Sequence, residues 1–134
     1  NVRRGPGESY PGRKAGSPVG LYTGSIDAQH VPYIMPQENG NKTDVRWATV
    51  TDAQGRGLKM SASSLMQISA AHHTASDLFA ARHTVDLVRR PEVYVNLDLA
   101  QCGLGGASCG PGTRDEYLVW PGAHRLTVLL RPVA

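Results

Sequence analysis

Apolar side chains occupy every second position between residues 92 and 101, at Val93, Val95, Leu97 and Leu99. Successive side chains of a β-strand point to opposite faces of a sheet, so a period of two predicts a strand that buries one face. This is the clearest strand signal in the chain, and it predicts a fold built around a sheet.

Further strands are predicted upstream of that segment. Residues 45–51 are rich in β-branched and aromatic side chains, residues 52–55 read Asp-Ala-Gln-Gly, and residues 57–61 return to apolar character. Two such runs around a short turn predict a β-hairpin. Residues 65–69 alternate enough to predict another strand. A final hairpin is predicted at residues 117–130.

One short helix is predicted from Thr74, because a hydroxyl residue followed three positions later by Asp77 is close to a capping box. Helical spacing continues to Val85, and the helix should close before the Arg89–Pro91 segment. Six or seven strands with one short helix predict a mainly β protein, an antiparallel β-sandwich, with residues 1–134 as one domain.

Two segments are rich in glycine and proline. Residues 1–19 show no periodicity and predict an irregular segment over the surface. Between Val31 and Pro36 the prolines hold an apolar run extended, which suits an edge strand or a segment that crosses a sheet face. Asn39-Gly40 then favours a turn with positive φ.

The charge pattern excludes some classes of function. The fourteen basic and eleven acidic residues give a formal charge of +3 and are mixed along the chain, without the basic clusters and interleaved aromatics of a nucleic-acid binder. No apolar run approaches the ~20 residues of a membrane span. We expect neither nucleic acid nor membrane as a partner and place the protein in the cytoplasm. Because the chain begins with Asn1, we expect it to be a piece of a longer polypeptide.

Three acidic residues lie near glycine or proline in predicted loops, where functional residues concentrate: Glu8, Glu38 and Asp44. Glycoside hydrolysis needs two carboxylates on either side of the scissile bond, and eleven acids leave that chemistry open. A solvated loop carboxylate is the more ordinary interpretation of each.

The histidines and cysteines predict no metal site. No histidine pair has the spacing of metal ligands on one helix or strand face. Cys102 and Cys109 bracket a glycine-rich stretch, and without a secretory signal we expect free thiols. That stretch lacks the Lys-Ser/Thr of a phosphate-binding loop, so it predicts a tight loop between strands.

Five short patterns follow one another along the chain. They are Arg4-Gly5-Pro6-Gly7-Glu8-Ser9-Tyr10-Pro11, Pro32-Tyr33, Pro36-Gln37-Glu38-Asn39-Gly40, Asn96-Leu97-Asp98 and Gly103-Leu104-Gly105-Gly106. Their order and spacing resemble the C-terminal domain of the bacterial β-galactosidases of glycoside hydrolase family two. The resemblance covers almost the whole chain. It implies the C-terminal half of a galactose-mutarotase-like supersandwich.

The resemblance also implies a division of labour. In that family the catalytic glutamates lie on a preceding TIM barrel, so this piece should carry no catalytic residue and its partners should be the preceding domains and a galactoside. Glu38, Asn39 and Gly40 are implied to border the active site, and Cys109 stands where the family has a sugar-stacking tryptophan. A retaining mechanism, Mg and Na or K in the full-length enzyme, no metal in this chain and a homo-oligomer are implied as well.

Two other functions stay open at this point. A stand-alone carbohydrate-binding module would need Trp47, Tyr94 and Trp120 exposed together as a platform, whereas aromatic residues on strands are more often core residues. An aldose epimerase of the same sandwich type would need an acid and a pair of histidines facing one pocket.

Overall fold

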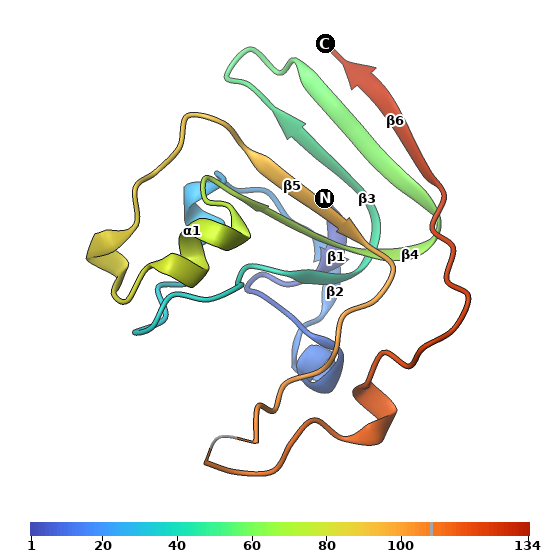
Figure 1. Ribbon diagram of the computed structural model, residues 1–134. Coiled ribbons are helices and arrows are strands. Elements are labelled where there is room, and N and C mark those ends of the chain that lie inside the picture. The colour runs from blue at the N-terminus through green and yellow to red at the C-terminus, as the bar shows by residue number, and fades with distance from the viewer. Residues whose placement is uncertain (108) are drawn as a thin grey trace.

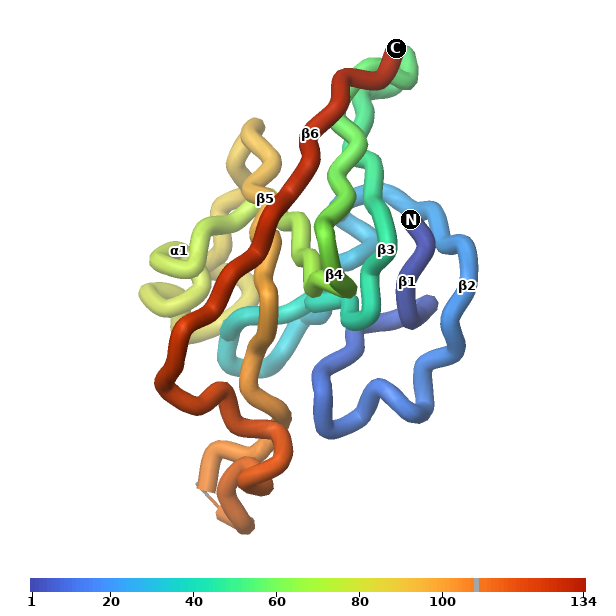
Figure 2. Tube along the Cα trace, turned by 90° about the vertical axis from the view of Figure 1, so that its right-hand side faces the viewer, coloured from blue at the N-terminus to red at the C-terminus, as the bar shows by residue number. Residues whose placement is uncertain are grey.

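The structure is a computed structural model that describes residues 1–107 and 109–134. A six-stranded antiparallel sheet forms its centre, with the order β2-β1-β3-β4-β5 and with β6 paired to β4. In Figure 2 these first five strands follow one another from right to left. The strands are β1 (Val2–Arg4), β2 (Val19–Leu21), β3 (Lys42–Thr51), β4 (Gly57–Ala71), β5 (Tyr94–Asp98) and β6 (Val128–Val133).

Helical structure is limited. The described residues contain one α-helix, α1 (Ala75–Ala80), and four 3₁₀ turns, η1 (Pro11–Gly16), η2 (Asp27–Gln29), η3 (Thr84–Asp86) and η4 (Asp115–Tyr117). The predicted class, a mainly β antiparallel fold with one short helix, is confirmed.

The predicted hairpin is formed by β3 and β4. Asp52 closes its turn because its carboxylate accepts the backbone N–H groups of Gln54 and Arg56, each at 2.9 Å. The separately predicted strands at residues 57–61 and 65–69 are one bent strand, β4 (Figure 1). On one edge β4 pairs with β3 in both halves, whereas on the other edge its first half pairs with β6 and its second half with β5. The change of partner explains the length of β4.

The core lies on one face of this sheet. It contains Val45, Ala48, Met60, Met66 and Ile68, with partly buried side chains from β5 packed against them. The alternation that predicted β5 is confirmed over Tyr94–Asp98, and the strand ends at Asp98, which pairs with Gln67 of β4.

Helix α1 begins as predicted and ends earlier. Thr74 Oγ1 accepts the Asp77 N–H at 3.1 Å, and the Asp77 carboxylate accepts the Thr74 N–H at 2.8 Å, which completes the capping box. The continuation to Val85 is wrong. The Asp86 carboxylate accepts the N–H groups of Arg82 and His83, at 3.2 and 2.9 Å, and so begins the separate turn η3.

Three other predictions of local structure are wrong. Residues 1–19 contain β1 and end in β2, which pair with each other through backbone bonds that need no apolar periodicity. Of the two alternatives for residues 31–36 the edge strand is wrong, since Tyr33 N–H turns back to Val31 O at 2.9 Å, and a segment that crosses a sheet face stays a prediction. Residues 117–120 also form no strand, and β6 pairs instead with the first half of β4.

Candidate functional site

Two segments far apart in sequence form the site. The Ser9 N–H donates to Asn41 O at 2.8 Å, and the Thr43 N–H donates to the Ser9 hydroxyl at 3.0 Å. Asn41 also donates from Nδ2 to Gln67 Oε1 at 2.6 Å, which ties the pair to β4. Buried polar groups need partners, so this layer fixes the two segments against the sheet.

Gly40 is held from both sides. Its N–H donates to the Glu8 carboxylate at 2.8 Å, and its carbonyl accepts from the Lys42 ammonium at 2.8 Å. The backbone has φ +76° here, and a Cβ would lie 2.8 Å from Gln29 O. The predicted Asn39-Gly40 turn with positive φ is therefore confirmed at Gly40, where only glycine fits without strain.

Lys42 is a buried cation beneath this turn. Desolvation and the nearby Arg3 charge lower its pKa to about 8, against the opposing effect of Glu8 and Glu38. The second oxygen of Glu8 accepts a hydrogen bond from the Tyr33 hydroxyl. That hydrogen bond, with burial, raises the pKa of Tyr33 to about 12. Both carboxylate oxygens of Glu8 are thus engaged in holding the loop.

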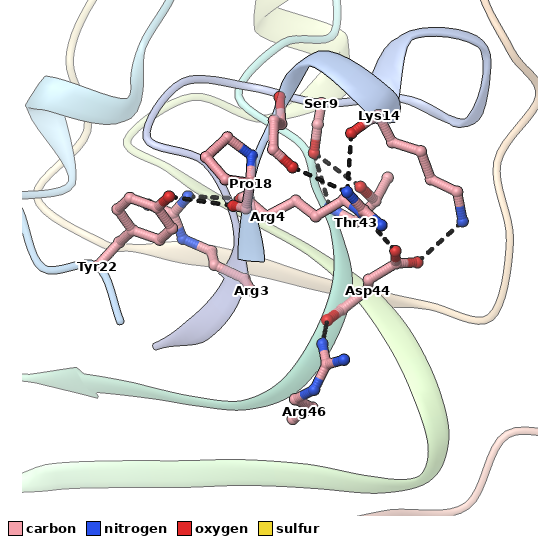
Figure 3. Close-up of polar contacts among 10 residues, drawn as sticks. Arg3, Arg4, Ser9, Lys14, Pro18, Tyr22, Thr43, Asp44 and Arg46 are labelled. Atoms are coloured by element: carbon pink, nitrogen blue, oxygen red, sulfur yellow. Dashed lines mark hydrogen bonds and ion pairs between the residues drawn. The ribbon is translucent and has the colours of Figure 1, made fainter. Parts of the chain in front are cut away.

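Asp44 anchors the N-terminal segment to β3 (Figure 3). Its carboxylate accepts from Arg4 Nε and, at 3.0 Å, from Lys14 Nζ, while Arg4 also donates to Ser17 O at 2.9 Å. Burial opposes ionisation, yet these hydrogen bonds hold the pKa of Asp44 below its usual value. Asp44 has φ +52°, which aspartate tolerates better than most residues, and Arg46 donates to its carbonyl at 2.7 Å. The cluster is an anchor for the chain.

A groove of about 440 Å³ opens beside the loop, between it and the glycine-rich stretch. Glu38 lies in its wall and accepts the Tyr10 hydroxyl at 2.7 Å. Desolvation raises the pKa of Glu38, although the hydrogen bond from Tyr10 acts in the opposite direction. Burial and that carboxylate also raise the pKa of Tyr10. The groove is lined by Tyr10, Tyr33, Gln37, Glu38, Gln101, Cys102, Gly103, Leu104, Gly105 and Gly106.

The four predicted site residues occupy different positions relative to this groove. Glu38 lines it, Gly40 lies in the turn behind it, and Asn39 stabilises the loop by accepting the Val31 N–H at 3.0 Å. Asn39 also lines a neighbouring cavity of about 250 Å³. Cys109 is exposed on the glycine-rich stretch and is not one of the groove residues.

Sequence reasoning did not place Tyr10, Tyr33, Gln37 or Gln101 in the site. The sequence did offer a signal for Tyr10 and Tyr33, because each lies next to a proline in one of the patterns that resemble the family. Aromatic hydroxyls beside fixed backbone are suited to orient polar ligands. Gln101 follows the β5 strand and carries no comparable signal.

The geometry bears on both alternative functions. Trp47 and Tyr94 are half-buried, and the Lys59 ammonium lies 4.8 Å from the Trp47 ring centroid, so these residues form no flat exposed platform with Trp120. The rings of His30 and His73 lie 5.5 Å apart, but only His73 shares the cavity of about 250 Å³ with Glu38. An acid and a histidine pair facing one pocket are not found among the described residues.

Within residues 1–107 and 109–134, no group of three or more His, Cys, Asp and Glu side chains is arranged to hold a metal ion. In that part of the chain no helix has the length and apolarity to cross a membrane. Cys102 and Cys109 are both exposed free thiols, as predicted.

Comparison with known proteins decides the family. A sequence profile described as β-galactosidase small chain matches residues 2–130. The chain belongs to this family. The resemblance found in the sequence is therefore confirmed, and the antiparallel sheet is the fold of a β-galactosidase small-chain member.

Relatives of this small-chain segment are much longer proteins. A β-galactosidase of Priestia megaterium is 42% identical over 132 residues, which cover 97% of this chain and 13% of that protein. β-Galactosidases of Arthrobacter sp. strain B7 and Photobacterium profundum are 33% and 30% identical, over 95% and 96% of this chain and 13% and 12% of their own lengths. The chain thus spans about an eighth of the relatives it matches.

Proposed function

We propose that residues 1–134 are the C-terminal β-sandwich domain of a β-galactosidase that hydrolyses terminal non-reducing β-D-galactosides with retention of configuration. Family membership over residues 2–130 carries the proposal. The domain would be half of a galactose-mutarotase-like supersandwich, and its partners are the preceding domains, including a TIM barrel. A barrel needs about 250 residues, so it must lie outside this segment.

The engagement of the candidate acids supports the view that this domain contributes no catalytic carboxylate pair. A retaining pair stands about 5 Å apart across the substrate, and each carboxylate must be free to react. Glu8 is occupied by Tyr33 and the Gly40 N–H, and Asp44 by Arg4 and Lys14. Glu38 is the one of the three that faces the groove.

The role proposed for this domain is to shape the mouth of the active site. Tyr10 engages Oε2 of Glu38, so Oε1 is the oxygen placed to accept a hydrogen bond from a sugar hydroxyl. Asn39 and Gly40 set the position of Glu38 through the turn. With Cys109 in place of a stacking aromatic, the leaving-group sugar is held by polar contacts more than by stacking.

The remaining properties are proposed for the whole enzyme. Mg and Na or K would activate it, as in the family that the sequence resembles. We further propose a homo-oligomer in the cytoplasm, where free thiols such as Cys102 persist. Loss of activity on chelation and its recovery with added Mg would support the first point.

The test uses the full-length polypeptide and a chromogenic β-galactoside. We expect turnover by the full-length protein, the β-anomer as first product by NMR, and no turnover by residues 1–134 alone. Glu38→Gln keeps the size of the side chain and removes its charge, so KM should rise severalfold while kcat changes less than about threefold. Glu92→Gln, the same change at an exposed remote position, is the matched control. A loss of kcat of about a thousandfold in Glu38→Gln would show that Glu38 does chemistry and would contradict the proposed role.

A further inference from the structure

Four of the exposed large apolar side chains belong to two neighbouring segments, residues 31–36 and residues 75–86. Ile34 is 92% exposed, Phe79 91%, Val85 89% and Met35 69%. We call these four residues the apolar patch. Single exposed apolar residues are common on protein surfaces, whereas a group of them is not.

The members of the apolar patch come from two segments that touch. Thr84 Oγ1 donates to Tyr33 O at 3.4 Å, which brings η3 against the residues that precede Ile34. Pro36 and Phe79 line one cavity of about 250 Å³, together with Leu78 from the buried side of α1. Figures 1 and 2 both show α1 beside the segment that carries Ile34.

The apolar patch is preformed by the fold. The Thr74 capping box fixes α1, and Asn39 fixes the end of the 31–36 segment through Val31. Exposed apolar side chains of this size add up to on the order of 500 Å², at the upper end of what monomeric proteins leave in contact with water. Such a surface is typical of a contact with another folded unit.

We propose that the apolar patch is the surface on which the remainder of the same β-galactosidase polypeptide packs. This inference rests on the proposed function. The chain spans only 12–13% of its relatives, so most of such a polypeptide is available to cover the patch. A tethered partner acts at an effective concentration in the millimolar range, which favours it over a second copy in free solution.

The patch also continues into the proposed active-site mouth. Pro36 ends the segment that carries Ile34 and Met35, and Gln37 and Glu38 follow it directly into the groove. A contact on the patch would therefore set the distance of Glu38 from the substrate bound by the other domain. The cavity beside Phe79 is suited to receive one apolar anchor of the partner.

Oxidation of the three methionines tests this packing in the unmodified full-length protein. Met35 is exposed in this segment, whereas Met60 and Met66 are buried in the core, so they are internal references. Peroxide converts accessible thioethers to sulfoxides, and peptide mass spectrometry resolves each site. We expect Met35 to oxidise at least tenfold more slowly in the native protein than in urea, as Met60 and Met66 do. Oxidation of native Met35 at its rate in urea would overturn the proposal.

A variant and a dilution series identify the occupant. Phe79→Ser should accelerate Met35 oxidation at least fivefold, whereas Leu65→Ser, at an exposed site in β4, should leave it unchanged. Protection of Met35 that persists on dilution to monomer supports an intramolecular partner. Protection that disappears with the loss of a dimer overturns it in favour of a second copy. Galactoside turnover is measured separately, so failure of the proposed function and failure of this packing are distinguishable.

Discussion

Gly40 is the position where a single added carbon should disturb the candidate site most. A Cβ there would lie 2.8 Å from the backbone oxygen of Gln29, and φ is +76°. The left-handed conformation costs a non-glycine residue roughly 1–2 kcal/mol. Forcing an atom into an occupied contact costs about 1–3 kcal/mol more. Gly40→Ala should therefore destabilise the closed loop by about 2–5 kcal/mol.

Amide hydrogen exchange measures this effect locally. The Ser9 N–H is bonded to Asn41 O and exchanges only when the two segments separate. Because each 1.4 kcal/mol is about a factor of ten, Gly40→Ala should accelerate this exchange by about 30-fold or more. A local rather than a global measurement suits the proposed multidomain polypeptide, which need not unfold in one step.

Two other glycines separate the cost of the positive φ from the cost of the steric contact. Gly7 has no neighbouring atom within 4 Å of a built Cβ and an ordinary φ, so Gly7→Ala should leave the exchange of Ser9 nearly unchanged. Gly55 has φ +84° in open space, so Gly55→Ala should show only the conformational cost, measured at the amides that close its own turn. If the Ser9 N–H exchanges in Gly40→Ala at a rate within threefold of its rate in Gly7→Ala, the argument that Gly40 is sterically required is refuted.

Two further predictions concern buried charge. The pKa of Lys42 in the folded protein, about 8, lies below its unfolded value of 10.5, so the unfolded state binds more protons at this site in the interval. Lys42 should therefore contribute a rise of about 2 kcal/mol to the free energy of unfolding between pH 8 and 10. Lys42→Met should remove that contribution in urea titrations at each pH, followed by hydrogen exchange in the peptides of this domain, and an unchanged slope would exclude Lys42 as its source. Asp44→Asn keeps the backbone preference and removes the charge that holds Arg4 and Lys14, so it should cost about 2 kcal/mol. Glu116→Gln, which alters an exposed pair, should cost less than about 0.5 kcal/mol by the same titration, and equal losses in both variants would contradict the anchoring role.

Local chemistry explains which elements were predictable. The β3–β4 turn, the Thr74 capping box and the alternation of β5 each depend on residues within a few positions, and each is found in the structure. The predictions failed where a distant partner decided the conformation. β1 exists because β2 and β3 offer hydrogen-bonding partners, and residues 117–120 form no strand because β6 pairs with β4.

The candidate site divides in the same way. The short sequence patterns that resemble the family identified it and drew attention to Glu38, Asn39 and Gly40. They did not show that Asn39 and Gly40 position the loop while Tyr10 and Tyr33 line the groove. A side chain next to a site in sequence and a side chain that faces it look alike until the backbone direction is known.

The sequence by itself determined the strand periodicities, the turn at Gly40, the helix cap and the family, because these depend on short-range sterics and on the order of residues. The tertiary structure alone decided that the Glu8 carboxylate would accept the Gly40 N–H, 32 positions away, and that the Asp44 carboxylate would accept a hydrogen bond from Arg4, 40 positions away. It also decided that Pro36 and Phe79 would line one cavity. Such contacts arise only when strand pairing closes long loops, and no local preference encodes which ends then meet.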